Sequence, residues 1–244
     1  MIYNSFVFTG HGTSEVTGAY DPGATSGKNV EHDIAKQIVQ ASKKYLDTLS
    51  LNIHYDENNF SDNDLANNTY TAKSGLSVHI NAGGGTGVEV YVPLKELYLD
   101  ADFTICSDIS KLLGIPNRGV KSRVYDTGNT YIRVNGVMSS GKDYYKEIRD
   151  AWNNGISLSI LEVGFIDTGD IDKIKAHIDE LGYYVAKYIA LNCNQLLPKI
   201  AVNTVYRVKV DGAQIGAYSK IDNILAEVER CLKDKRGKIE IVKK

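Results

Sequence analysis

Cysteine is scarce in this chain of 244 residues. The three cysteines, Cys106, Cys193 and Cys231, are odd in number and far apart, and no Cys-x-x-Cys pair occurs. They cannot form a disulfide framework. Because each falls in a helix-like apolar pattern, we expect small core residues rather than metal ligands.

The chain also lacks a surplus of charge of one sign. It has 28 Lys and Arg against 30 Asp and Glu, a formal net charge of −2. Proteins that bind along nucleic acid usually carry a basic surplus, so nucleic acid is not an expected partner. The locally basic stretch 233–238 is predicted to be the solvated end of a helix.

Long hydrophobic runs are missing as well. No apolar stretch is long enough to span a bilayer, so we expect no membrane insertion. The first residues lack the basic stretch and apolar core of a signal peptide. We therefore expect synthesis in the cytoplasm. A substrate outside the membrane would need another component to let the protein through.

Hydrophobic residues make up 43% and charged residues 24% of the chain, which is ordinary for a soluble globular protein. Strand-like and helix-like runs alternate, which predicts an α/β layer architecture. The predicted strands are 5–9, 51–55, 76–81, 88–92 and 156–163. The predicted helices are 30–49, 62–73 with Ser61 as its cap, 97–113, 144–153 and 171–192. Residues 125–142 are expected to form an irregular loop with a short strand at 131–134.

A boundary is predicted near 197–203, giving domains 1–197 and 198–244. The second domain has its own pattern, with strands at 205–210, 214–218 and 238–242 and an amphipathic helix at 221–233, in ββαβ order. It is near the size limit for independent folding. Pairing with a copy of itself, or docking on the larger domain, would bury its open face.

Two histidines and a glutamate suggest a metal centre. His11, between Gly10 and Gly12, follows an apolar run, and His79 lies near the end of another. Glu31 is placed at a predicted helix start. Two imidazoles and a carboxylate are the ligand set of a catalytic zinc ion that keeps one position open for water.

Ordinary structural roles remain open for these residues. Histidines at strand ends can be satisfied by backbone hydrogen bonds, and the helix dipole alone favours a glutamate in a first helical turn. His32, Asp33 and Glu15 are rival ligands.

Glu162 ends the most hydrophobic predicted strand. A carboxylate there is costly unless it is paired, hydrogen-bonded or near a cation. Beside a metal ion and its water, Glu162 could serve as a general base. The alternative is a carboxylate at the exposed end of the strand, paired with Arg118 or Lys121.

Short blocks along residues 1–193 together resemble the zinc-dependent N-acetylmuramoyl-L-alanine amidases of the amidase-3 type. The blocks are Gly10-His11-Gly12, Asp21-Pro22-Gly23-Ala24, Glu31, Ser77-Val78-His79-Ile80-Asn81-Ala82, Gly87-Val88-Glu89-Val90-Tyr91, Asn117-Arg118-Gly119-Val120-Lys121 and Leu161-Glu162-Val163-Gly164-Phe165-Ile166.

The resemblance implies that His11, Glu31 and His79 bind Zn²⁺ and that Glu162 is the catalytic acid/base. It implies a mixed, mostly parallel sheet of about six strands with helices on both faces and a shallow site groove at one edge. The implied reaction is hydrolysis of the peptidoglycan amide between N-acetylmuramic acid and L-alanine of the stem peptide. The spacer 13–20 is longer than the family pattern.

The last 40 residues or so resemble half of a SPOR-type peptidoglycan-binding module, which implies wall binding or self-association into a homodimer. With no secretion signal, the arrangement resembles a phage endolysin or an autolysin of a Gram-positive bacterium. Two other functions stay open. One is a zinc carboxypeptidase on wall peptides, with Arg118, Arg123 or Arg133 binding a free carboxylate. The other is a non-catalytic wall-binding protein.

Overall fold

The computed structural model describes residues 2–14, 16–58, 71–198, 206–218, 221–234 and 236–243. The chain divides into two compact units, Met1–Leu197 and Pro198–Lys244. Most of the helix predicted over 62–73, and its cap Ser61, lie outside the described residues.

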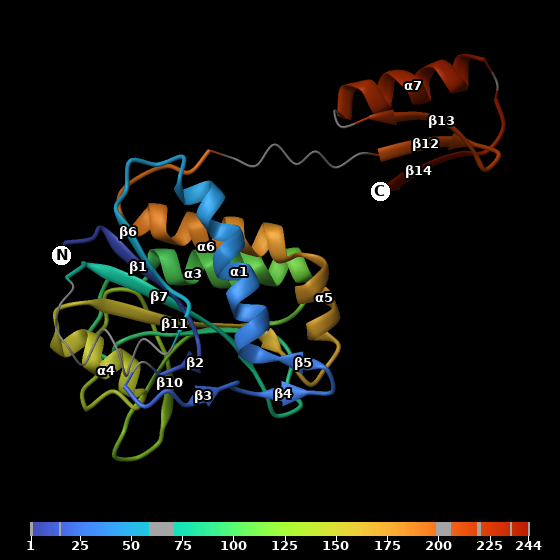
Figure 1. Cartoon of the computed structure of the whole chain (residues 1–244). Coiled ribbons are helices and arrows are strands. Elements are labelled where there is room, and N and C mark those ends of the chain that lie inside the picture. Colours follow the sequence, from blue (N-terminus) through green and yellow to red (C-terminus); the bar gives the residue numbers. More distant parts are fainter. Residues whose placement is uncertain are drawn as a thin grey trace. The chain divides into compact units, whose positions relative to one another are not determined.

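The larger unit is built on a seven-stranded sheet with the strand order β10-β9-β8-β11-β7-β1-β6 (Figure 1). The strands are β1 (Ser5–Thr9), β6 (Ile53–Asp56), β7 (Ser74–Asn81), β8 (Val88–Tyr91), β9 (Asn117–Arg123), β10 (Thr130–Ile132) and β11 (Ser157–Phe165). Neighbouring strands are parallel except at β8–β11 and β9–β10. The predicted mixed, mostly parallel α/β sheet is confirmed, with seven strands rather than about six.

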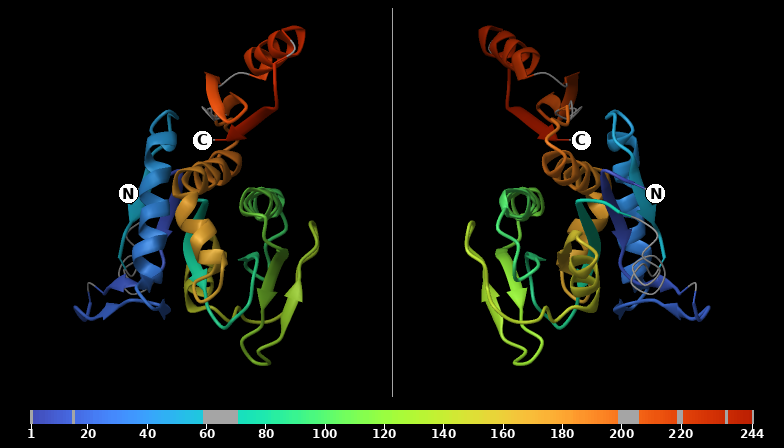
Figure 2. Two further views of the ribbon diagram at one scale, coloured as in Figure 1. Left: turned by 90° about the vertical axis from the view of Figure 1, so that its right-hand side faces the viewer. Right: turned by 90° about the vertical axis from the view of Figure 1, so that its left-hand side faces the viewer.

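Helices cover the two faces unequally. The long helices α1 (Glu31–Leu46), α3 (Asp100–Leu113) and α6 (Ile178–Asn192) pack along one face (Figures 1 and 2). This layer buries the main core, since the strand residues that face it are aliphatic. The short helix α4 (Lys146–Asn153) packs on the opposite face, where Ala151 meets Phe6, Phe8 and Leu158.

The prediction of one helix over 171–192 is wrong. The segment forms α5 (Asp170–Ala176) and α6, separated at His177, whose φ of −130° is not helical. The backbone N–H of His177 donates to Ile174 O, and its ring Nδ1 lies 3.1 Å from Lys173 O. This local capping ends α5, although the apolar spacing runs on through the break.

Two small hairpins lie between β1 and α1. The strands β2 (Gly12–Thr13) and β3 (Tyr20–Asp21) form the first, and β4 (Thr25–Ser26) and β5 (Asn29–Val30) form the second. They fold residues 12–30 back so that the segment at Asp21 and the start of α1 meet the carboxyl end of β1. No apolar periodicity predicted them, because each strand is only two residues long.

The smaller unit is a three-stranded antiparallel sheet with one helix. Its elements are β12 (Tyr206–Val210), β13 (Ala213–Tyr218), α7 (Ile221–Lys233) and β14 (Ile239–Lys243), and the strand order is β13-β12-β14. Helix α7 packs on β12 and β13 and buries Val208, Ile224 and Cys231. The ββαβ order is the predicted one.

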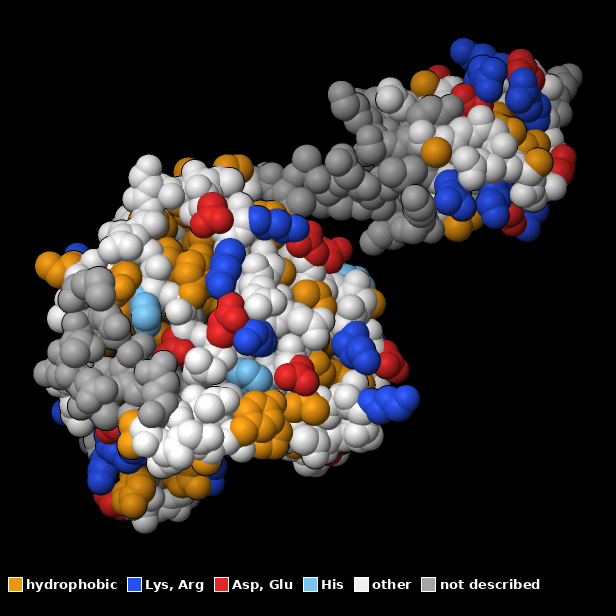
Figure 3. Space-filling model, in the orientation of Figure 1, with side chains coloured by type: hydrophobic (Ala, Val, Ile, Leu, Met, Phe, Trp, Pro, Cys, Tyr) orange, Lys and Arg blue, Asp and Glu red, His pale blue; other side chains and the backbone are white. Residues whose placement is uncertain are grey.

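The described surface is of mixed charge on the face drawn in Figure 3, where basic and acidic side chains of the larger unit are interspersed. Among the residues that the structure describes, no helix combines the length and apolar character needed to cross a bilayer.

Asp102 in α3 supplies a test of the core. It is 3% exposed and accepts hydrogen bonds from Ser159 Oγ at 2.7 Å and Tyr188 Oη at 3.2 Å. Burial raises the pKa of its carboxyl to about 7, above the ordinary value of 3.8. The native state therefore holds this proton more tightly than the unfolded chain, so this group makes stability fall as pH rises between these two values.

Asp102→Asn removes this titration. The difference in unfolding free energy between about pH 5 and about pH 8 should shrink by about 3 kcal/mol, because about two units of the pKa shift fall in this range and each corresponds to about 1.4 kcal/mol. Urea unfolding at the two pH values measures it, with Asp100→Asn at the exposed start of the same helix as the control. An unaltered pH dependence in Asp102→Asn would contradict the assignment.

Candidate metal and catalytic site

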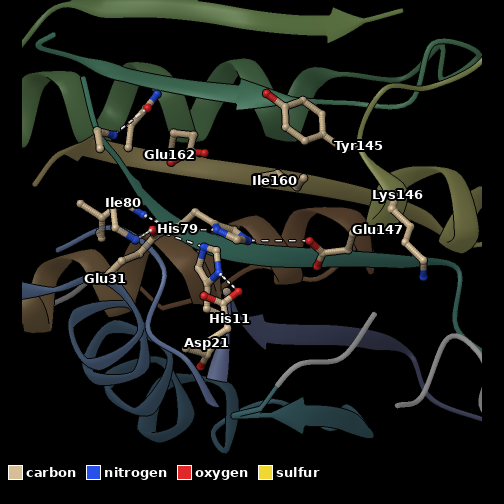
Figure 4. A pocket seen from close by; sticks show the side chains of 15 residues that line it. His11, Asp21, Glu31, His79, Ile80, Tyr145, Lys146, Glu147, Ile160 and Glu162 are labelled. Carbon is tan, nitrogen blue, oxygen red and sulfur yellow. Dashed lines mark hydrogen bonds and ion pairs between the residues drawn. The ribbon is translucent and has the colours of Figure 1, made fainter. Parts of the chain in front are cut away.

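The predicted site residues come from the carboxyl ends of three neighbouring parallel strands. His11 follows β1, His79 lies near the end of β7, and Glu162 lies near the end of β11 (Figure 4). Glu31 is the first residue of α1, which enters at the same edge of the sheet. Ligands of open α/β sheets usually bind at this edge.

The structure brings His11, Glu31 and His79 together. Glu31 Oε2 lies 3.3 Å from His11 Nε2, and Glu31 Oε1 lies 3.0 Å from His79 Nδ1. One donor atom from each residue lies within 4.8 Å of those of the other two. Two imidazoles and a carboxylate at this spacing can share one divalent cation.

Two glycines make room for this convergence. A Cβ atom on Gly10 would lie 2.3 Å from Cε1 of His79. A Cβ on Gly23 would lie 2.5 Å from Cδ2 of His11 and 2.6 Å from Oε2 of Glu31. These distances are far below van der Waals contact, so both positions need glycine for the three side chains to approach one another.

Hydrogen bonds orient the three side chains. His11 Nδ1 lies 2.8 Å from Asp21 Oδ2, which favours the proton on Nδ1 and leaves Nε2 facing Glu31. The backbone N–H groups of Ala24 and Ile80 donate to the two oxygens of Glu31. On His79, Nε2 lies 3.1 Å from Ser77 Oγ and Nδ1 faces Glu31.

Attraction between the Glu31 carboxylate and the two imidazoles stabilises the partly buried cluster. Burial disfavours charge on Glu31, yet hydrogen bonds from His11 and His79 outweigh it and hold the pKa of this carboxyl well below its usual range. Burial likewise disfavours charge on His79, yet Glu147 and Glu31 raise its pKa well above the ordinary value. The site therefore stabilises positive charge at the place where a cation would sit.

Glu162 stands beside the cluster with an unsatisfied oxygen. It is the register partner of His79 on β7. Its Oε2 is buried and has no hydrogen-bond partner among the described residues. Burial raises its pKa to about 7; His79 opposes this rise and the charges of Glu31 and Glu89 add to it. A carboxylate with this pKa suits general acid/base work near neutral pH.

The alternative pairing of Glu162 with Arg118 or Lys121 does not occur. Both cations bind Glu89 instead, with Arg118 Nε at 2.6 Å and Lys121 Nζ at 2.5 Å from its Oε2. Glu89 is only 2% exposed and takes up this positive charge. Glu162 is left available for solvent or substrate.

None of the alternative ligands His32, Asp33 and Glu15 is seen in the cluster among the described residues. The Nδ1 atom of His32 lies 3.0 Å from the backbone oxygen of Gly10, so His32 supports the turn that carries His11. His11 itself has a φ of +63°, which few residues other than glycine adopt. Asp33 is exposed on α1, and Glu15 lies outside the described residues.

A pocket of roughly 400 Å³ opens over the cluster. Besides the predicted residues it is lined by Asp21, Asn81, Tyr145 and Glu147 (Figure 4). Glu147 Oε2 lies 3.7 Å from His79 Nε2. The roles of Asp21 and Glu147 were not predicted. Asp21 stands in a turn motif, Asp-Pro-Gly, which could have drawn attention to it, whereas Glu147 gave no signal beyond its place in a helix.

The sequence profile of the amidase-3 family, described as N-acetylmuramoyl-L-alanine amidase, matches residues 6–176. The chain belongs to this family, and its enzyme class is that of the N-acetylmuramoyl-L-alanine amidases. The match covers every predicted metal ligand and Glu162, so the proposed centre lies wholly within the family's region.

Individual proteins are similar to the chain in sequence or in fold. The chain is 28% identical over 229 residues to the sporulation-specific N-acetylmuramoyl-L-alanine amidase of Bacillus subtilis (strain 168), covering 87% of this chain and 76% of the relative. Among solved structures, Cwp6 from Clostridium difficile matches 78% of this chain with a TM-score of 0.58 and 24% identity, over only 29% of its own length. The putative N-acetylmuramoyl-L-alanine amidase from Neisseria meningitidis matches 80% of this chain and 98% of its own, with a TM-score of 0.55 and 16% identity. These structures support the fold.

Gly23→Ala tests the cradle, the space that Gly10 and Gly23 leave around His11, Glu31 and His79. The added methyl group collides with His11 and Glu31, so the zinc dissociation constant of the predicted ligand set should rise more than tenfold, as when supporting contacts of metal ligands are lost. Gly27→Ala is the matched control. It imposes a similar left-handed backbone strain of about 1–2 kcal/mol but meets no atom within 4 Å. Titration with zinc against a chelating dye measures both, and equal affinities for the two variants would count against the cradle.

Proposed function

We propose that His11, Glu31 and His79 hold a zinc ion and that Glu162 is the acid/base of a peptidoglycan amidase. The observation that carries the proposal is the meeting of two imidazoles and one carboxylate, with donor atoms within 4.8 Å, beside a buried carboxylate oxygen without a partner. The donor set suits zinc, and three protein ligands leave a position open for water.

The chain's own residues account for most of the chemistry. When bound, zinc supplies Lewis-acid polarisation of the scissile carbonyl and water of lowered pKa. Glu162 takes the proton of the attacking water and delivers it to the leaving amine. Asp21 accepts the Nδ1 proton of His11, so that Nε2 of this ring faces the cluster, and Ser77 contacts Nε2 of His79. Tyr145 and Ile160 line the pocket beside these groups.

The substrate follows from the family. Hydrolysis of the amide between the lactyl group of N-acetylmuramic acid and L-alanine releases an intact stem peptide from the glycan. The role that we propose is that of a lytic wall enzyme, a phage endolysin or an autolysin of a Gram-positive bacterium. Similarity to a sporulation-specific amidase of Bacillus subtilis supports the bacterial alternative.

Glu162→Gln tests the assignment of the base. The amide keeps the size of the side chain but cannot accept the proton, so wall hydrolysis should fall roughly 10²-fold or more. Zinc content should stay at the parent level, whereas His79→Ala should lose the metal. Mass spectrometry of digested walls should find free lactyl groups and intact stem peptides in the parent digest. Clearing of walls by Glu162→Gln at the parent rate would refute the assignment.

The smaller unit is proposed to bind the wall or to pair with a second copy of itself. Its sheet has helix α7 on one face, and Ile241 and Val242 of the edge strand β14 stay 51% and 41% exposed within the unit. A tethered wall-binding unit raises the local concentration of an insoluble substrate.

Removal of residues 198–244 separates these roles. The fragment 1–197 should cleave soluble muropeptides as fast as the full chain but bind insoluble walls at least tenfold more weakly, because the tether is lost. Sedimentation of both proteins reports pairing. Equal wall binding by monomeric full chain and monomeric fragment would exclude both roles.

A further inference from the structure

We propose that Arg118 is a specificity residue that binds a carboxylate on the peptide part of the substrate. The proposal rests on the proposed function, since it takes the cluster of His11, Glu31 and His79 and the carboxylate of Glu162 as the reaction centre.

Arg118 is brought onto the face of the sheet that carries the site. Residues Glu162, Glu89 and Gly119 are register partners on β11, β8 and β9, so these positions share one face. The β8–β9 register shifts between Val88 and Glu89, which leaves Arg118 as the extra residue of a bulge. A bulge changes the direction of the side chain that it carries. Here it turns the Arg118 side chain toward Glu89, which it contacts through Nε.

The Arg118 side chain is held ready for a ligand. Its guanidinium lies over the Phe165 ring at 5.1 Å, and its Nε donates to Glu89. A Cβ on Gly87 would lie within 3.0 Å of its Cδ, so glycine clears the path of the side chain. The side chain is still 37% exposed, and Nη1 makes only a 3.5 Å contact with Thr86 O. Among the described contacts, guanidinium N–H groups remain for a carboxylate.

The local charge favours an anion. Arg118 and Lys121 are two cations on one buried carboxylate, Glu89, which leaves a net positive charge on this part of the sheet face. Asn81, which lines the pocket, donates to the same Glu89 at 3.0 Å. The group formed by Glu89, Arg118 and Lys121 therefore adjoins the pocket.

The peptide part of the substrate is expected to extend toward Arg118. Glu162 delivers its proton to the leaving amine, which belongs to the peptide, so the peptide leaves the cluster on the Glu162 side. In the strand order this is the side of β8 and β9. Neighbouring strands lie about 4.8 Å apart and an extended peptide advances about 3.4 Å per residue. The second residue of the stem therefore comes within reach of the long Arg118 side chain.

The other two arginine candidates do not fit. Arg133 is 3% exposed, and its two terminal nitrogens donate to four oxygen atoms of the protein. Arg123 donates to Gly128 O and stacks on Tyr144 at 3.8 Å, at the far end of β9 from the bulge.

The test uses two N-acetylmuramoyl peptides that differ only in whether the second residue carries a free carboxylate or its carboxamide. The full-length parent protein should prefer the carboxylate by roughly tenfold in kcat/KM, mostly through KM, the size of one charge-assisted hydrogen bond. Arg118→Gln should bring the ratio close to one, and Arg118→Lys should restore part of it. Arg123→Gln, on the same strand, should keep the parent ratio.

Two sets of results separate failure of this inference from failure of the proposed function. A parent protein without preference, or an Arg118→Gln variant that loses both substrates equally, overturns the inference, because a purely structural role through Glu89 would not distinguish them. Failure of the zinc-loaded parent to cleave either peptide would instead overturn the proposed function. Thermal unfolding of each variant checks that it is folded.

Discussion

The carboxylate of Glu31 between two imidazoles is the interaction on which the site depends. It is a buried negative charge, and it is tolerated because His11, His79 and two backbone N–H groups surround it. The two small hairpins bring Asp21 and α1 to this point, and Gly10 and Gly23 allow contact distances that a side chain would prevent. The hairpins between β1 and α1 thus bring Glu31 into contact with His11 and His79.

The two faces of the sheet have separate tasks. One face is aliphatic and is sealed by α1, α3 and α6, which supplies stability. The other carries a row of ionisable side chains across β7, β11 and β8, from His79 through Glu162 to Glu89. Burial raises the pKa of Glu162, and because Glu89 takes both nearby cations, no cation pairs with Glu162 to lower it. A carboxylate neutralised by two cations and one without a cation partner thus lie side by side on neighbouring strands.

Much of this could be predicted from sequence, because the signals were local. Apolar runs that end in histidine or glutamate revealed His11, His79 and Glu162 at strand ends, and alternating periodicities predicted the α/β sheet. The strand β9 was missed because its residues are mainly polar and a bulge interrupts its pairing. The break at His177 was missed because the apolar spacing is continuous across it. The partners Asp21, Glu89 and Glu147 act through contacts distant in sequence, which no periodicity records.

Anomalous X-ray scattering from crystals of the zinc-loaded protein, collected on both sides of the zinc absorption edge, tests the central claim most directly. We expect one zinc peak, about 2.0–2.2 Å from His11 Nε2, His79 Nδ1 and a Glu31 oxygen, with Glu162 outside the ligand set. A zinc ion bound elsewhere, or no zinc among these three side chains, would contradict it.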